Sequence, residues 1–240
     1  MPRPRTPARI SESLHQRLNS YALAASAAGV GMLALVQPAE AKIVYTPGHK
    51  VLRGSDPPKT LPLDLDNDGK SDFEMLDLWT VDQDFGSAGW LYLFPSHWPN
   101  GAEGYLSAGG TIIISALAAG AKIGRSKTFM SGNSSPLMCH ATEYSSREGR
   151  WCNARDRYIG LRFSIKGKVH YGWARVSTTV DKHAHITATL TGYAYETIPG
   201  KSIVAGKTHG KDVITVQDAS LGHLARGSSA ISTWRVKEGK

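Results

Sequence analysis

The chain of 240 residues lacks the signatures of several enzyme classes and has little hydrophobic sequence of membrane-spanning length. It contains no Gly-x-Ser-x-Gly nucleophile elbow, no His-Glu-x-x-His zinc motif and no complete phosphate-binding loop. The uncharged stretch at residues 21–36 is rich in Ala and Gly and shorter than the roughly 20 apolar residues of a spanning helix. These absences argue against the enzymes that those motifs define and against residues 21–36 as a membrane anchor, so no transmembrane span is predicted after signal cleavage.

The N-terminal region has the three parts of a cleavable signal peptide. Residues 21–36 are its apolar segment, and Ala39-Glu40-Ala41 is a small-x-small cleavage site. The preceding basic region contains Arg3, Arg5, Arg9 and Arg17. We therefore predict that residues 1–41 form a signal helix that is removed, and that the mature protein is secreted, periplasmic or on the outer cell surface.

Charge and cysteine content fit an exported protein. The whole chain has 28 basic and 20 acidic side chains, and removal of the leader leaves 24 and 18, a mild net charge of +6. These charges form no basic stripe or recognition motif, so no nucleic-acid partner is predicted. The two cysteines, Cys139 and Cys152, are predicted to form a disulfide in an oxidising compartment.

Strand-like sequence dominates the mature chain, and helical sequence is scarce. Strands are predicted at residues 42–46, 72–79, 111–115, 158–165, 169–176 and 185–197. Lys166-Gly167 is predicted to be the turn of a hairpin, residues 115–122 about two turns of helix, and residues 82–105 and 124–157 long loops. The pattern predicts an all-β domain at residues 42–205, an antiparallel β-sandwich of jelly-roll or concanavalin-like type. Residues 206–240 are predicted to be a flexible tail, with a degenerate sorting segment at 221–234.

The segment Asp64-Leu-Asp-Asn-Asp-Gly-Lys-Ser-Asp72 is the motif with the clearest chemistry. Carboxylates occupy positions 1, 3, 5 and 9, and a glycine occupies position 6, where an EF-hand loop turns sharply. The glutamate at position 12 is missing and the flanks are strand-like, so the loop is not a complete EF-hand. It predicts a structural calcium ion held by Asp64, Asp66, Asp68, the Lys70 carbonyl and Asp72. The alternative is a turn without an ion.

Aromatic and histidine residues leave other functions open. His183 and His185 lie on one strand face and could bind a transition metal with Asp181, although a polar outward face is favoured. Tyr171 and Trp173 share a strand face and are predicted to pack in the core. The tryptophans in or near the predicted loops, which could form a carbohydrate-binding platform, are Trp79, Trp90, Trp98 and Trp151.

Three stretches together resemble a group of uncharacterised exported bacterial proteins, some of which carry a PEP-CTERM-type sorting tail. They are the junction Ala39–Thr46, the segment Leu63–Phe73, and the strand motifs Tyr158–Phe163, His170–Arg175 and Gly192–Glu196. The resemblance implies export and an all-β domain, and it supplies no catalytic residues.

The leading functional prediction is a secreted or cell-surface, calcium-stabilised domain with a structural or interaction role and no catalytic activity. Its predicted partners are a polysaccharide or another envelope component, and self-association is a further possibility. A carbohydrate-binding module is the first alternative. An extracellular polysaccharide hydrolase is the second, because a pair of carboxylates leaves no local sequence signature.

Overall fold

A computed structural model describes residues 41–82, 86–131, 135–144 and 146–216. The predicted signal peptide, apart from Ala41, and the predicted sorting segment lie outside these residues. The described part of the chain consists of strands, turns and loops and contains no helix. Its strands are β1 (Ile43–Arg53), β2 (Lys59–Leu63), β3 (Phe73–Asp82), β4 (Gly86–Pro95), β5 (Gly101–Leu106), β6 (Ile112–Ile114), β7 (Lys122–Ile123), β8 (Phe129–Met130), β9 (Leu137–Thr142), β10 (Arg147–Glu148), β11 (Arg157–Ile165), β12 (Lys168–Val180), β13 (Ile186–Glu196), β14 (Ile203–Val204) and β15 (Val213–Thr215).

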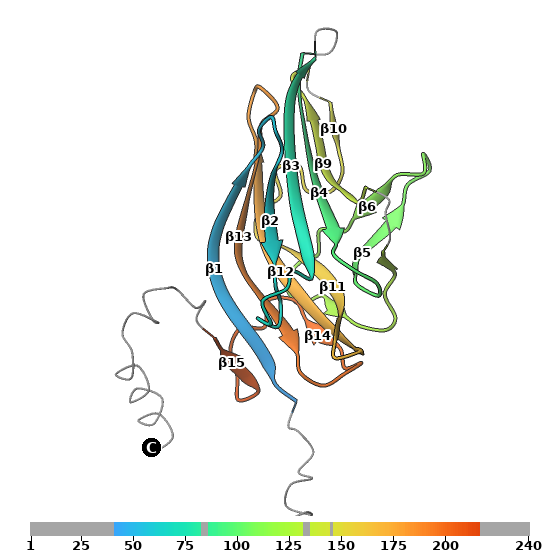
Figure 1. Cartoon of the computed structure of the whole chain (residues 1–240), viewed down its shortest axis with the longest axis vertical. Coiled ribbons are helices and arrows are strands. Elements are labelled where there is room, and N and C mark those ends of the chain that lie inside the picture. Colours follow the sequence, from blue (N-terminus) through green and yellow to red (C-terminus); the bar gives the residue numbers. More distant parts are fainter. Residues whose placement is uncertain (1–40, 83–85, 132–134, 145, 217–240) are drawn as a thin grey trace, which may run out of the picture. The chain divides into compact units, whose positions relative to one another are not determined.

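Thirteen of these strands form one continuous, curled sheet (Figure 1). Its order is β15-β1-β13-β12-β11-β5-β6-β9-β4-β3-β2, and β8 and β10 pair with β5 and β9. Most pairs are antiparallel, but β1–β15 and β6–β9 are parallel, so the sheet is mixed. We call β15, β1, β13, β12 and β11 the β13 half and β9, β4, β3 and β2 the β4 half. They are connected through β5 and β6.

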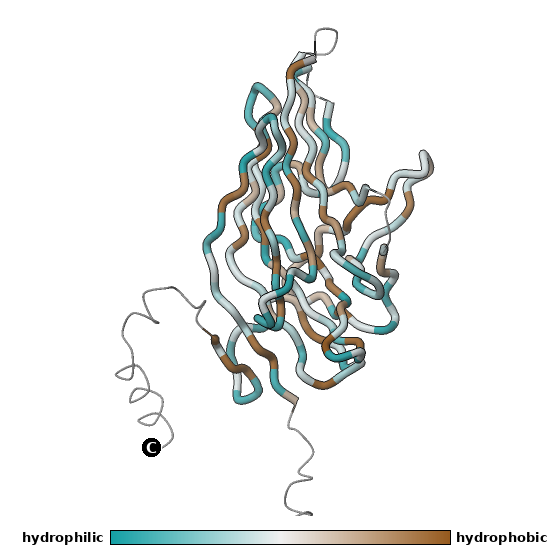
Figure 2. Tube along the Cα trace, viewed as in Figure 1, coloured by the Kyte–Doolittle hydropathy of each residue, from teal (hydrophilic) through white to brown (hydrophobic). Residues whose placement is uncertain are grey.

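The main hydrophobic core lies between the two halves. Phe73 and Met75 of β3 and Leu161 and Phe163 of β11 are completely buried in the same cluster. In Figure 2 hydrophobic segments recur along the strands of both halves. The alternation of side chains along each strand places one set in this core and the next on the opposite face. Burial of this apolar surface is the main stabilising contribution to the domain.

A second hydrophobic cluster covers the other face of the β13 half. Trp173 and Tyr171 of β12 are buried there with Ile123 of β7 and Ile203 of β14, which form a separate two-stranded sheet. The predicted core packing of Tyr171 and Trp173 is confirmed. His170, on the opposite face, is also buried, and its Nδ1 lies 2.8 Å from the Glu196 carbonyl oxygen.

The prediction of an all-β fold is confirmed, and so is the hairpin at Lys166-Gly167. Strands β11 and β12 pair from Arg157–Val176 to Ile165–Lys168, and both turn residues have positive φ angles, 49° and 76°. This is the backbone that a two-residue type I′ hairpin requires. The sandwich itself is not confirmed, because the strands remain hydrogen-bonded in one curled mixed sheet and do not separate into two.

Several local predictions are wrong. The predicted helix at residues 115–122 is an extended segment with turns, anchored by the pairing of Leu117 with Tyr158. The predicted loops at 82–105 and 124–157 contain β4, β5, β8, β9 and β10. Beyond residue 205, β15 pairs with the start of β1. The conformation of these segments depends on hydrogen bonds to strands that are distant in the sequence. Local composition does not predict this pairing.

The described residues contain no helix with the length and apolar character needed to cross a membrane.

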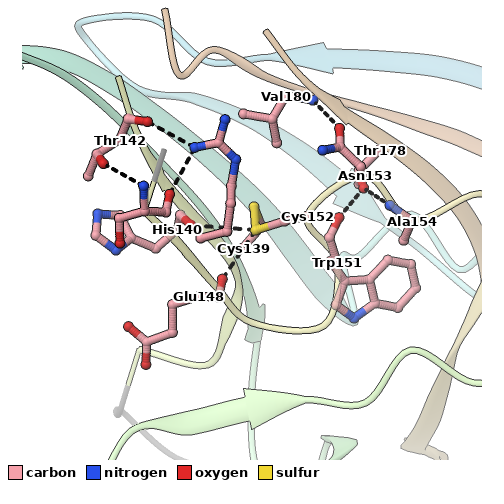
Figure 3. Close-up of a disulfide and its surroundings, with 12 residues drawn as sticks. Cys139, His140, Thr142, Glu148, Trp151, Cys152, Asn153, Ala154, Thr178 and Val180 are labelled. Carbon is pink, nitrogen blue, oxygen red and sulfur yellow. Dashed lines mark hydrogen bonds between the residues drawn. A yellow bond between two sulfur atoms is a disulfide. The ribbon is translucent and has the colours of Figure 1, made fainter. Parts of the chain in front are cut away.

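Cys139 and Cys152 form a disulfide, as the sequence predicts (Figure 3). Cys139 lies in β9 and is fully buried, whereas Cys152 lies in the loop that leads to β11. This loop is bonded to β12: the Thr178 hydroxyl donates to the Trp151 carbonyl, and the Val180 amide donates to the Asn153 side chain over 2.8 Å. The disulfide therefore connects the β4 half to a loop that is fastened to the β13 half.

Candidate metal-binding loop and the adjoining turn

The loop with the calcium-type spacing connects β2 to β3. These strands pair antiparallel, and the last pair before the loop is Leu63–Phe73. Leu65, between the first two acidic residues, is completely buried in the main core. Its backbone amide donates a 2.9 Å hydrogen bond to the Asp72 carboxylate. One apolar anchor and one backbone-to-carboxylate bond thus fix both ends of the loop.

Asp64 organises the turn within the loop. Its carboxylate accepts hydrogen bonds from the Asp68 amide at 3.2 Å and from the Gly69 amide at 2.8 Å. Gly69 has a φ of +88°, a left-handed conformation that glycine adopts without steric cost. This bond between the Gly69 amide at position 6 and Asp64 at position 1 closes the loop around the Asp64 carboxylate. It brings the other acidic residues of the loop toward Asp64.

Three of the predicted ligands lie together. Asp64, Asp66 and Asp72 each offer a carboxylate oxygen, and these oxygens lie within 4.8 Å of one another. Calcium binds oxygen at 2.3–2.6 Å, so two ligands of one ion are separated by at most about 5 Å. The three oxygens therefore fit one ion of this size without rearrangement of the backbone.

Asp68 does not join this cluster. One Asp68 oxygen accepts the Lys70 amide at 2.8 Å, and both residues are exposed. An ion at the cluster would have three carboxylate ligands from the chain, and calcium requires six to eight oxygens in total. Bidentate carboxylates, the Lys70 carbonyl and water would have to complete the shell.

The electrostatics of the cluster favour a cation. The pKa of Asp72 is raised to about 6, first by burial and then by the charges of Asp66 and Asp64, against hydrogen bonds from Leu65 and Asn100 that lower it. The pKa of Asp66 is also raised, first by burial and then by the charges of Asp68 and Asp64. Partly desolvated carboxylates at this separation repel each other, and a divalent cation removes both the repulsion and the cost of burial.

A neighbouring turn is built onto the same loop through Asn100, which sequence analysis missed. The Asn100 side chain is completely buried. Its amide nitrogen lies 3.1 Å from the Asp72 carbonyl oxygen and 3.4 Å from the Asp72 carboxylate, and its oxygen accepts the Ser164 amide of β11 at 3.1 Å. The Ser96 amide also donates to the Asp72 carbonyl, at 2.9 Å. The only sequence signal for this turn is the run Trp98-Pro99-Asn100-Gly101. Such a run is typical of turns, but it does not predict which residues the turn contacts.

The loop also contacts the β13 half. The Tyr193 hydroxyl of β13 donates to the Asn67 side chain over 3.3 Å. A cavity of about 260 Å³ lies at this junction and is lined by residues of the loop, Lys50 of β1 and Tyr193. The loop is therefore held directly by β13 and, through Asn100, by β11.

The group of Asp181, His183 and His185 forms a turn and does not have the geometry of a metal site. Asp181 accepts the His183 and His185 amides at 2.9 and 3.0 Å, which caps the turn between β12 and β13. His185 stacks on Trp79 at a ring separation of 4.1 Å, and the Trp79 indole donates to the His183 carbonyl. Among the described residues, the Asp64–Asp66–Asp72 group is the only set of three or more ligand-type side chains this close together.

The predicted loop tryptophans do not share one surface. Trp151 is completely buried, and Trp79 and Trp90 lie on opposite faces of the β4 half, because Trp79 pairs with Gly89 and Trp90 with Leu78. Trp90 stacks on His140 at a ring separation of 4.9 Å. Trp98 alone among the tryptophans of the described residues is largely exposed, with 80% of its surface accessible.

The buried acids give no support to the hydrolase alternative. Glu103 is paired with Lys127 at 3.1 Å, and Glu196 with Lys201 at 3.2 Å. Asp77 is completely buried, and burial raises its pKa to about 8 against a contact with the Gly54 amide that lowers it. Two of these carboxylates are thus explained as ion pairs, and the third is isolated.

Comparison of the chain with protein-family models, with curated proteins and with solved structures found no match.

Proposed function

We propose that the protein is an exported, calcium-stabilised β domain with a structural or interaction role at the cell surface or outside the cell, and not an enzyme. The observation that carries this proposal is the convergence of the Asp64, Asp66 and Asp72 oxygens within 4.8 Å, in a loop that closes a β-hairpin. An ion bound there would hold β2 against β3.

Export supports this proposal from two directions. The Cys139–Cys152 disulfide suits an oxidising compartment. Calcium sites of extracellular modules bind with Kd values of about 10⁻⁴–10⁻³ M, which an exported loop with three carboxylates would match. The relation to exported proteins with a PEP-CTERM-type tail stays a prediction of the sequence.

Calcium titration by calorimetry tests the proposal, with two aspartate variants as a matched pair. Asp66→Asn removes a carboxylate of the cluster, whereas Asp68→Asn removes an exposed charge from the same loop that lies outside the cluster. We expect a Kd of about 10⁻⁴–10⁻³ M for the unchanged chain, at least about tenfold weaker binding for Asp66→Asn, and a smaller change for Asp68→Asn.

No binding by the unchanged chain would reject the ion, and an equal loss in both variants would reject this ligand set. Export is tested separately, by sequencing the N-terminus of the secreted protein, which we expect to begin at Lys42.

A further inference from the structure

The turn after β4 exposes an aromatic side chain that the fold does not use. Trp98 is 80% accessible, the largest exposed fraction among the large hydrophobic side chains of the described residues. Trp151 and Trp173, by contrast, are completely buried. Tryptophan is usually well buried in folded proteins, and its large planar ring is enriched in binding sites.

The backbone around Trp98 is firmly held. The Asn100 amide donates to the His97 carbonyl at 2.9 Å, which closes a turn with Trp98 and Pro99 at its centre. Before the turn, the Ser96 amide is bonded to Asp72, and after it Arg162 donates to the Pro99 carbonyl over 3.2 Å. The exposed ring is therefore presented by a fixed backbone, which lowers the entropy cost of binding.

Asn100 is the residue that positions this turn. It is completely buried, and its side chain joins Asp72 of the metal-binding loop to Ser164 of β11. An amide is suited to this place because it donates and accepts at once. Neither partner contact involves the exposed ring itself, so the position of the turn and the chemistry of Trp98 can be tested separately.

The chemistry around the ring indicates the class of ligand. Ser96 and His97 are exposed beside Trp98 and offer a hydroxyl and an imidazole, groups that can donate and accept hydrogen bonds. A tryptophan that anchors a protein partner is normally surrounded by a packed ring of other contacts. A planar apolar surface bordered by small polar groups suits a sugar, whose C–H face stacks on an aromatic ring while its hydroxyl groups bind at the rim.

We propose that the turn at residues 96–99 is a carbohydrate-contact site, in which Trp98 stacks on a neutral saccharide and Asn100 is a positioning residue. The proposal rests on the interaction role proposed above and assigns a neutral polysaccharide as the partner. The Asn100 contacts that position the turn are made between protein atoms.

An array of neutral gluco-, xylo-, manno- and chito-oligosaccharides probed with the purified full chain tests this proposal, followed by calorimetry with the oligosaccharide that binds most strongly. We expect Trp98→Ala to weaken binding at least tenfold without changing the melting temperature, because the side chain is mostly exposed. Tyr144→Ala is the matched control: Tyr144 is 75% exposed, lies between β9 and β10, and should be dispensable.

Asn100→Ala should weaken the same binding less than Trp98→Ala, and should lower the fluorescence anisotropy of Trp98, obtained by difference from Trp98→Phe. If Asn100→Ala does not fold, the comparison of Trp98→Ala with Tyr144→Ala decides alone. Absence of saccharide binding, or equal binding by Trp98→Ala, overturns the proposal. So does concentration-dependent self-association that Trp98→Ala abolishes without any saccharide binding.

A parallel calcium titration of each sample separates this proposal from the metal-binding proposal. Saccharide binding that depends on Trp98 but occurs without calcium binding would leave the carbohydrate site standing and reject the ion. Calcium binding without saccharide binding would do the reverse.

Discussion

Replacement of Asp77 by asparagine should remove a large part of the pH dependence of stability. Asp77 lies on the inner face of β3 and is completely buried, and a contact with the Gly54 amide is the one interaction that lowers its pKa. Burial raises the pKa of this carboxyl from 3.8 to about 8. The folded domain therefore keeps the proton over a pH range in which the unfolded chain has lost it.

The sign and size follow from proton linkage. Between about pH 4 and pH 8 the folded state binds more protons at this site than the unfolded state, so stability falls as the pH rises. Each pH unit within that window costs about 1.4 kcal/mol, and the step from pH 5 to pH 7.5 should cost about 3 kcal/mol. Well below pH 4 the carboxyl is protonated in both states and well above pH 8 it is ionised in both, so the contribution of Asp77 becomes flat there.

Urea unfolding at pH 5, 6, 7 and 7.5, followed by tryptophan fluorescence, measures this effect. The unfolding free energy of the unchanged chain should fall by about 3 kcal/mol more than that of Asp77→Asn over this range. Other groups, including Asp72 with its pKa of about 6, titrate in both proteins and cancel in the difference. Equal slopes would refute the reasoning, and a steeper fall in the variant would mean that Asp77 is ionised and paired in the folded protein.

Three further predictions concern stability. Gly54→Ala should destabilise the domain by about 1–3 kcal/mol, because an added Cβ would lie 2.4 Å from an Asp77 oxygen; Gly48→Ala, with no atom within 4 Å, is the control in chemical unfolding. Replacing Cys139 and Cys152 by alanine should cost about 3 kcal/mol and abolish the effect of reductant on the urea midpoint; an unchanged midpoint would contradict this. At 10 mM calcium, Kd values of about 10⁻⁴–10⁻³ M predict stabilisation by about 1.4–2.7 kcal/mol, or a melting temperature higher by about 3–10 °C, which chelator should reverse in scanning calorimetry.

The strands that sequence patterns predict well are those with a clear contrast between their two faces. β11 has it, with Ile159, Leu161 and Phe163 in the main core. β12 is apolar on both faces, with Val176 in the main core and Trp173 in the second cluster, and it is recognised through the Lys166-Gly167 turn that joins it to β11. β4 has no such contrast, because Leu91 and Leu93 face the core while Trp90 and Tyr92 face outward. Its glycine-rich start also resembles a loop. A strand with apolar side chains on both faces is recognised only when its neighbours in the sheet are known.

The residues of the candidate site also differ in whether the sequence can predict them. The spacing of Asp64, Asp66 and Asp72 is local, and so a loop that brings acidic groups together could be predicted from the sequence. Asp68 has the same spacing rule but bonds to the Lys70 amide, and only the folded geometry separates it from the cluster. Asn100 is 28 residues from Asp72 in the sequence, so its contact depends on how β4 returns beside β3.

The number of hydrogen bonds that Asp72 can accept explains how an ion in the Asp64–Asp72 loop and the Asn100 turn could be held by the same carboxylate. One of its carboxyl oxygens accepts the Leu65 amide and the other faces the Asn100 amide. An ionised carboxylate has about four lone-pair positions, so Asp72 can bind an ion and keep both contacts. Ion binding then adds to the existing bonds and does not replace them. Because Asn100 also holds Ser164, the loop, the Trp98 turn and β11 form one connected unit. Stabilising the loop therefore also stabilises the backbone that presents the most exposed aromatic side chain of the described residues.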